Sequence, residues 1–139
     1  MNVSSSALSA QRTRMNLISS NLANANATRT PEGGPYKRKD AVFAATPAAS
    51  SFNRALDGAT AQQVRKVDVS DIIEDQNPPR LQYDPSHPDA NPQGYVAMPN
   101  VNVVEEMADM ISATRSYEAN VTAVQAAKSM ALKTLEIGK

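Results

Sequence analysis

The last third of the chain carries one continuous pattern of apolar and polar positions. Between about Pro99 and Gly138, apolar or small side chains recur at steps of three and four residues, and only Lys128 interrupts them. The positions are Val103, Met107, Met110, Thr114, Tyr117, Val121, Val124, Ala131 and Leu135. This spacing predicts one face of an α-helix of about 36 residues and about 54 Å. A small domain rarely needs so long a helix, so we expect it to pack along a partner as in a coiled coil.

Both ends of this predicted helix are marked in the sequence. Asn102 can accept a hydrogen bond from an N–H group of the first turn, and Glu105 can reach back to it as in a capping box. Glu106 and Asp109 add negative charge near the positive end of the helix dipole. Gly138 stands where glycine commonly ends a helix. The sequence therefore predicts one uninterrupted helix.

A second helical pattern covers residues 4–27 near the start of the chain. Its apolar face consists of Leu8, Met15, Ile18, Leu22 and Ala25. The remaining positions are mostly Ser, Asn, Ala and Thr, which favour close packing against other proteins over a freely solvated surface. The alternative is a helix that packs only on its own domain. Because a short polar helix is marginal alone, we expect the terminal segments to be frayed in the isolated chain and helical after assembly.

The end of this first helix is rich in asparagine, at Asn21, Asn24 and Asn26. Asparagine is a poor residue in a helix interior, because its side-chain amide competes for backbone hydrogen bonds. Several asparagines together predict side chains that hydrogen-bond across an interface between subunits. The alternative is that they only terminate the helix.

The residues that follow the first helix change from helical periodicity to turns and strands. Turn-forming Pro and Gly residues fill 30–35, and residues 36–44 then read as a first strand. A second strand is predicted over 63–74, where Val67 and Val69 alternate with charged side chains. The bulky apolar residues of this region are few, so any middle domain has a thin core.

Prolines are dense in residues 77–92, which excludes a central strand or a helix interior and indicates an extended loop. Residues 94–98 form a last short strand candidate. We predict a mainly α fold with a small, irregular β insert, in which the two long terminal helices pair as a coiled coil. The predicted segments are an N-terminal assembly helix in residues 1–30, a β-rich or loop insert in 31–98 and a long C-terminal assembly helix in 99–139.

The formal net charge is zero, with 14 basic and 14 acidic side chains, which argues against a nucleic-acid partner. The charges are nevertheless unevenly distributed. Residues 1–66 carry nine basic and three acidic side chains, a net charge of +6, which leaves −6 for the rest. Two halves of opposite net charge favour head-to-tail association between copies of the chain. The alternative is a chance segregation of solvated charges, which interact weakly at a surface.

No residue is cysteine, so disulfides and thiolate metal sites are excluded, and this composition would be harmless in an oxidising periplasm. The first twenty residues lack the apolar stretch of a cleaved signal peptide, and no segment has the ~20 apolar residues that cross a bilayer. If the protein leaves the cytoplasm, we expect export without a cleaved signal.

Catalytic chemistry has little support in the sequence. The single histidine, His87, stands between Asp84 and Asp89 in a loop where carboxylates and a hydroxyl suggest acid–base chemistry or a divalent ion. Proline-rich surface loops collect the same residue types as turn formers, which is the interpretation that we favour. No phosphate-binding loop or zinc-protease motif occurs. We therefore expect no enzyme activity, no cofactor and no metal.

Two stretches resemble the bacterial flagellar rod and hook family. The first is ISSNLANANAT at residues 18–28, followed by Thr30-Pro31 and by YKRK at 36–39. The second is GYVAMPNVNVVEEM at 94–107, continuing through RSYEAN at 115–120, and it is similar to the proximal rod members. Ala27 departs from the family pattern, which often places Thr directly after the last Asn. The short middle region also fits a proximal rod subunit better than the longer distal rod and hook proteins.

This resemblance implies a structural subunit of the flagellar basal body, exported unfolded through the flagellar type III apparatus and assembled in the periplasm as part of the motor's drive shaft. It also implies that both terminal helices pack as coiled coils around an axial channel. The implied partners are copies of the chain, other rod proteins and basal-body components at the cytoplasmic-membrane end. Two alternatives remain from the residues alone. One is a soluble coiled-coil adaptor that forms a finite complex, and the other is a periplasmic hydrolase that uses the His87 loop.

Overall fold

The computed structural model describes residues 2–47 and 65–137. Gln63 and Val64, the first residues of the predicted second strand, and Gly138, the predicted helix stop, lie outside the described residues. The elements are α1 (Asn2–Ala23), β1 (Lys39–Pro47), β2 (Arg65–Glu74), β3 (Arg80–Tyr83), β4 (Tyr95–Met98) and α3 (Val103–Ile137). The prediction of a mainly α fold with two terminal helices and a small β insert is confirmed.

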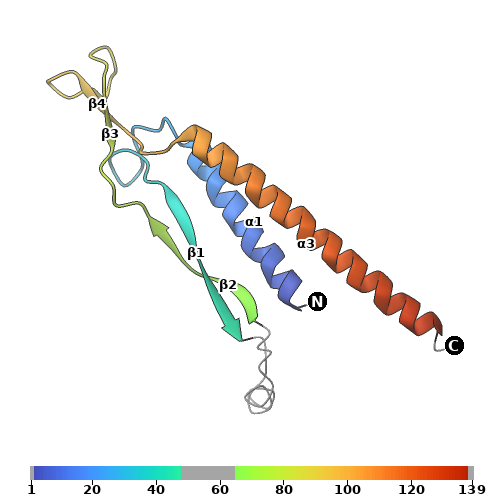
Figure 1. Cartoon of the computed structure of the whole chain (residues 1–139). Helices are drawn as coiled ribbons and strands as arrows, with labels where there is room; N and C mark the ends of the chain where they lie inside the picture. Colours follow the sequence, from blue (N-terminus) through green and yellow to red (C-terminus); the bar gives the residue numbers. More distant parts are fainter. Residues whose placement is uncertain (1, 48–64, 138–139) are drawn as a thin grey trace.

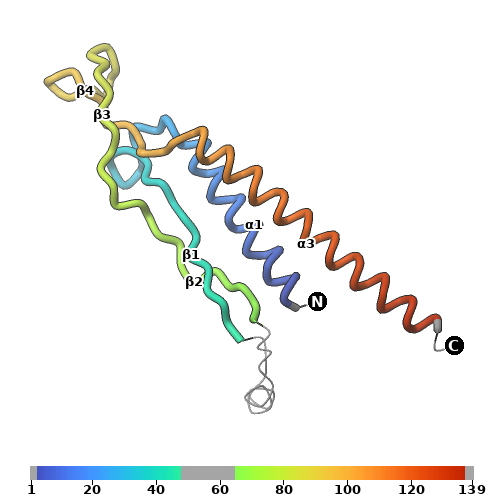
Figure 2. Tube along the Cα trace, in the orientation of Figure 1, coloured from blue at the N-terminus to red at the C-terminus, as the bar shows by residue number. Residues whose placement is uncertain are grey.

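The helix α1 lies in the middle of the molecule (Figures 1 and 2). The helix α3 runs antiparallel to it on one side, and the ribbon formed by β1 and β2 packs on it from another side. Since α3 has 35 residues and α1 has 22, the C-terminal end of α3 continues well past the start of α1. The β3–β4 hairpin stands at the opposite end of the molecule, near the beginning of α3.

Small side chains allow α1 and α3 to approach closely. Ala113 of α3 is 1% exposed, and Ala10 and Ile18 of α1 are also buried. The half-buried residues of α3 recur at steps of three and four from Ala113, at Ser116, Tyr117, Asn120, Val121, Val124 and Ala127. This is the helical periodicity that the sequence predicts, but the packed face is rotated, because Glu106 and Ala113 are buried where Met107 and Thr114 were expected.

The sequence predicts the start of α3 correctly but not the end of α1. The side-chain oxygen of Asn102 accepts a hydrogen bond from the N–H group of Val104 (3.2 Å), which confirms Asn102 as the cap of α3. The helix α1 ends at Ala23, four residues earlier than predicted. Residues 24–26 form a turn in which the N–H group of Ala27 donates to the carbonyl of Asn24 (3.0 Å). The helix therefore ends sooner than its apolar periodicity alone suggests.

The strands β1 and β2 form an antiparallel ribbon that pairs Lys39 with Glu74 at one end and Pro47 with Arg65 at the other. The register shifts between Val42 and Phe43, because Ser70 is an additional residue in β2, and its hydroxyl donates to the carbonyl of Val42 (3.1 Å). The first strand begins and ends three residues later than predicted. The ribbon covers α1 without making a deep core of its own.

The prediction of an unpaired loop over residues 77–92 is wrong for Arg80–Tyr83, which form β3 and pair with β4 in a second antiparallel hairpin. Prolines flank this strand at positions 79 and 85 and do not interrupt it. A strand in a two-stranded hairpin has a free edge, so proline nearby is tolerated. The rings of Tyr83 and Tyr95 meet edge to face, with 5.3 Å between their centroids, and this contact helps to hold the two strands together.

The hairpin depends on Gly94. This residue has φ +82°, a left-handed conformation that side-chain-bearing residues rarely adopt, and a Cβ atom there would lie 2.9 Å from the ring of Tyr83. We expect Gly94→Ala to destabilise the hairpin by about 1–3 kcal/mol. Faster amide exchange confined to residues 80–98 would show this effect. Gly33→Ala is the control, because Gly33 also has a positive φ but no atom near an added Cβ, so the comparison separates backbone strain from the clash with Tyr83.

Candidate assembly interface

The residues predicted to form an assembly interface on α3 fall into two groups. Met110, Tyr117, Val121 and Val124 are half-buried on the side of α3 that packs on α1. Val103, Met107, Thr114, Ala131 and Leu135 are exposed. The first group thus contributes to packing within the chain. The second group is largely open to solvent, although the hydroxyl of Thr114 still reaches the sulfur of Met15 on α1 (3.8 Å). Their role between subunits stays a prediction.

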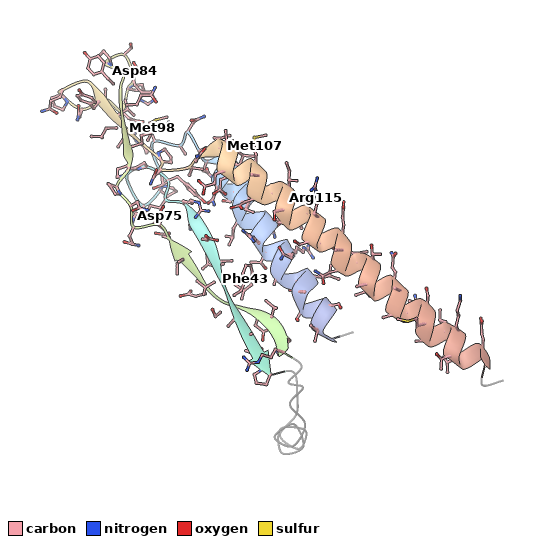
Figure 3. All side chains as sticks on the ribbon, in the orientation of Figure 1. Phe43, Asp75, Asp84, Met98, Met107 and Arg115 are labelled. Atoms are coloured by element: carbon pink, nitrogen blue, oxygen red, sulfur yellow. The ribbon has the colours of Figure 1, made fainter. Side chains whose placement is uncertain are left out.

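The exposed apolar side chains of α3 gather in two places. Near its start, Val104 is 75% exposed, and Met107 and Ile111 follow on the same face at steps of three and four. Figure 3 shows Met107 and Arg115 on the side of α3 that is turned away from α1. Near its end, every side chain from Lys128 to Glu136 is exposed. We call the first group the outer patch and residues 128–136 the overhang.

The overhang carries exposed apolar side chains, although it has no neighbour among the described residues. Met130, Leu132 and Leu135 are 64%, 53% and 70% exposed. It lies beyond the start of α1, and α1 is the element that packs on the rest of α3. A helix with these side chains gains little stability in water, since fraying begins at free ends and apolar contacts are missing. The overhang therefore has the character of a surface that another protein covers.

The predicted face of α1 is used within the chain. Ile18 is buried, and Leu8, Met15 and Leu22 are half-buried against α3 or the ribbon. The sulfur of Met15 accepts a hydrogen bond from the hydroxyl of Thr114 (3.8 Å). The apolar periodicity of α1 is therefore explained by packing on its own chain, which was the alternative interpretation for this helix. Whether its remaining surface also contacts other subunits stays a prediction.

Asn21 is 1% exposed and uses all the hydrogen bonds that its amide can make. The side-chain nitrogen donates to the carbonyl of Lys39 (2.9 Å) and to Oε2 of Glu106 (3.1 Å). The side-chain oxygen accepts from the N–H group of Lys39 (2.9 Å) and from the hydroxyl of Tyr36 (3.0 Å). All these partners belong to the same chain, so any effect of Asn21 on assembly would act through them.

Glu106 completes this arrangement from the first turn of α3. Its side chain is 1% exposed, and its second oxygen, Oε1, accepts a hydrogen bond from Nε of Arg38 at 2.6 Å. Arg38 is 25% exposed and also contacts Asp40 at 3.3 Å. A buried carboxylate requires such partners, because burying an unpaired charge costs several kcal/mol. We call Asn21, Tyr36, Arg38, Lys39 and Glu106 the polar junction.

The charges of the junction stabilise one another. Burial alone lowers the pKa of the Arg38 guanidinium, but the hydrogen bond and the negative charge of Glu106, together with Asp40, outweigh burial and hold that pKa above its ordinary value. Arg38 is therefore charged at every physiological pH. The ion pair with Glu106 persists as long as the carboxyl group stays ionised.

The other two asparagines of the predicted interface behave differently. The side-chain nitrogen of Asn24 donates to the carbonyl of Ser20 at 2.9 Å, within the last turn of α1. Asn26 is exposed. The contact of Asn24 is local to its own helix turn, and its role between subunits stays a prediction. Of the three, Asn26 alone is left with an exposed side chain.

The loop around His87 uses its polar groups to hold its own shape. Nδ1 of His87 accepts a hydrogen bond from the N–H group of Asp89 (3.1 Å). The carboxylate of Asp89 bonds to Arg29 (2.6 Å) and to the hydroxyl of Thr28 (2.9 Å), which ties the loop to the turn after α1. Asp84 accepts from the N–H group of Ser86 (3.1 Å). These contacts fit turn formation and leave no arrangement of acid and base around a pocket.

Sequence reasoning missed the polar junction. It assigned Glu106 to the helix dipole and used Arg38 as part of the YKRK stretch of the family resemblance, although the two side chains meet across 68 positions of sequence. A hint was available, because the residues of the junction lie in the two stretches that carry the family resemblance. What the spacing could not show is that these stretches meet in space.

The fold and its surface define a structural subunit with exposed apolar helix faces. The family described as "Flagella basal body rod protein" matches residues 1–29, and the family described as "Flagellar basal body rod FlgEFG protein C-terminal" matches residues 93–137. Curated relatives match almost the whole chain. A FlgC of Bacillus subtilis is 48% identical over 100% of this chain and 96% of its own length. A FlgC of Borreliella burgdorferi is 45% identical, and one of Salmonella typhimurium is 44% identical, each over 99% of this chain and 94% of its own length.

The chain therefore belongs to the family of flagellar basal-body rod proteins and is similar to its FlgC members. It is a structural subunit of the flagellar proximal rod and not an enzyme. Membership of this family implies assembly with other rod and basal-body proteins. Among the described helices, none is long and apolar enough to span a bilayer.

Proposed function

We propose that this subunit joins the rod through the exposed apolar side chains of α3, with the outer patch and the overhang in contact with neighbouring copies and with other rod proteins. The observation that carries the proposal is the overhang. Leu135 is 70% exposed and Met130 is 64% exposed on a helix that continues past α1, the one element that packs on it in the described part of the chain. Burying two such side chains between subunits would contribute about 3–6 kcal/mol to assembly.

We further propose that the chain reaches the periplasm through the flagellar type III export apparatus, without a cleaved signal peptide. Two properties support this route. The buried apolar side chains in the described residues are few and small, so unfolding the chain for export costs little. The absence of cysteine also means that an oxidising compartment cannot cross-link the chain before it assembles. We expect to find the protein in the periplasm with its Met1 intact. When the export apparatus is inactivated, the protein should be missing from the periplasm.

A substitution in the overhang tests the proposed interface. Leu135 makes no packed contact with the described residues, so Leu135→Asp should change the free energy of unfolding of the purified protein by less than about 0.5 kcal/mol. The same change should abolish swimming and reduce the number of basal bodies seen by electron microscopy. Gln93→Asp is the matched control, because it adds the same charge at an exposed loop position. Normal basal-body numbers in the Leu135→Asp cells would overturn the proposal.

The isolated chain offers a second test, which also separates a rod subunit from a finite adaptor. We expect fast amide exchange over residues 128–136 in the monomer and slow exchange there in assembled rods, because assembly supplies the missing partner. An adaptor would instead give a complex of fixed size without ordered multimers. Slow exchange of the overhang in a verified monomer would contradict the proposal that it needs a neighbour.

A further inference from the structure

The polar junction connects three segments that are far apart in sequence. Asn21 comes from the last turn of α1, Tyr36 and Arg38 from the chain before β1, and Glu106 from the first turn of α3. In the described part of the chain, the ribbon and α3 each pack on α1 but not on each other. Arg38 is thus the side chain that extends from the start of the ribbon to α3.

Stability alone does not explain a buried ion pair at this place. Removing a carboxylate from water is costly, and well-packed apolar residues of similar volume often serve as well or better. The junction instead supplies directional bonds. Asn21 can satisfy its four hydrogen bonds only with Lys39, Tyr36 and Glu106 in their present places. A shift of α3 by one residue would bring exposed Glu105 or Met107 to this point and leave Arg38 and Asn21 without their buried partner.

We propose that Arg38 and Glu106 are positioning residues for assembly, which fix the angle of the β1–β2 ribbon to the helix pair. This inference rests on the proposed function, because it matters only if neighbouring subunits contact more than one surface. The ribbon exposes apolar side chains of its own, including Phe43, Ile72 and Ile73. A rigid junction presents these side chains and the outer patch of α3 in one fixed relation. A neighbour that contacts both surfaces then meets a single shape, without the entropy cost of ordering the ribbon.

The absence of cysteine allows a direct measurement of this angle. Ala45→Cys on β1 and Ser112→Cys on α3 are exposed positions outside the junction, so spin labels there report the distance between the ribbon and α3 in the full-length chain. The variant to compare is Glu106→Gln, which keeps the shape of the side chain. Arg38 and Asn21 donate to different oxygens of Glu106, so in the variant one of them meets the amide NH2 group, which cannot accept, and its bond is lost. Glu105→Gln is the matched control on the exposed neighbour.

We expect a narrow distance distribution in the parent chain and in Glu105→Gln, and a roughly twofold broader one in Glu106→Gln, because the ribbon then samples several orientations. The double variant Arg38→Met with Glu106→Met should also broaden the distribution, yet keep the melting temperature close to that of the parent. Rods should be fewer with both junction variants. This result would separate positioning from stability. If the junction only stabilised the fold, a double variant with the melting temperature of the parent chain would also form rods in normal number.

Two outcomes would overturn the inference. One is a distribution that stays as narrow in Glu106→Gln as in the parent, which would mean that the junction does not hold the ribbon. The other is a broad distribution with normal rod numbers, which would mean that the angle is irrelevant to assembly. The distance is measured on the purified chain, so it stays informative even if the proposed contacts of the overhang are wrong. If the double variant does not fold, the isosteric Glu106→Gln variant decides by itself.

Discussion

Cells whose only copy of this protein carries Val121→Asp are expected not to swim, although the protein is exported at normal levels. Val121 is half-buried, on the face of α3 that packs on α1, two turns beyond Ala113. An aspartate there loses the apolar contact and places a carboxylate beside an apolar helix face. The expected cost is about 2–3 kcal/mol, which is a large fraction of the stability of so small a core.

Swimming assays on soft agar and a periplasmic immunoblot measure the two parts of this prediction. His87→Ala is the control. The His87 ring accepts a hydrogen bond from the N–H group of Asp89 in its own loop, so the substitution should be nearly silent. Motile cells with the aspartate would show that the contact between α1 and α3 is dispensable. If cells with His87→Ala did not swim although the protein was present at normal levels, the loop around His87 would have the larger role.

The second large effect is expected at Ala113, and it tests which face of α3 packs on α1. Ala113 is 1% exposed, so Ala113→Phe must push the two helices apart and should destabilise the chain by about 3 kcal/mol. Thr114, the next residue, belongs to the stripe predicted from the sequence but is exposed. The contact of its hydroxyl with the sulfur of Met15 is long, at 3.8 Å, so Thr114→Phe should change the free energy of unfolding by less than about 1 kcal/mol.

Urea unfolding followed by circular dichroism compares the two variants under identical conditions. The pair is matched in residue type and differs by one position, so propensity and size effects nearly cancel. If Thr114→Phe proved the more destabilising of the two, the packed face would be the one that the apolar stripe indicates. The same pair is informative in cells, because Thr114→Phe alters an exposed position of the predicted interface. Loss of rods at normal stability would place that position between subunits.

Local patterns in the sequence determine the existence and type of the elements. The steps of three and four along α3, its cap at Asn102 and the alternation of Val67 and Val69 are properties of contiguous residues, and each predicts an element that the structure contains. Boundaries are less well determined. The helix α1 ends at Ala23, four residues before the predicted end, and periodicity carries no information about the turn over residues 24–26 that follows it.

Tertiary structure alone decides which helix faces meet and which side chains become buried. Apolar periodicity indicates a stripe around Met107 and Thr114, yet α1 packs on Glu106 and Ala113, because small and hydrogen-bonded residues let the two helices come close. A buried glutamate has no signature in sequence. Its cost is offset only by Arg38 and Asn21, which are 68 and 85 positions away and reach it through the path of the chain. The sequence alone could also suggest a long helix in need of a partner, whereas the start of α1 in the antiparallel pair decides where the overhang begins.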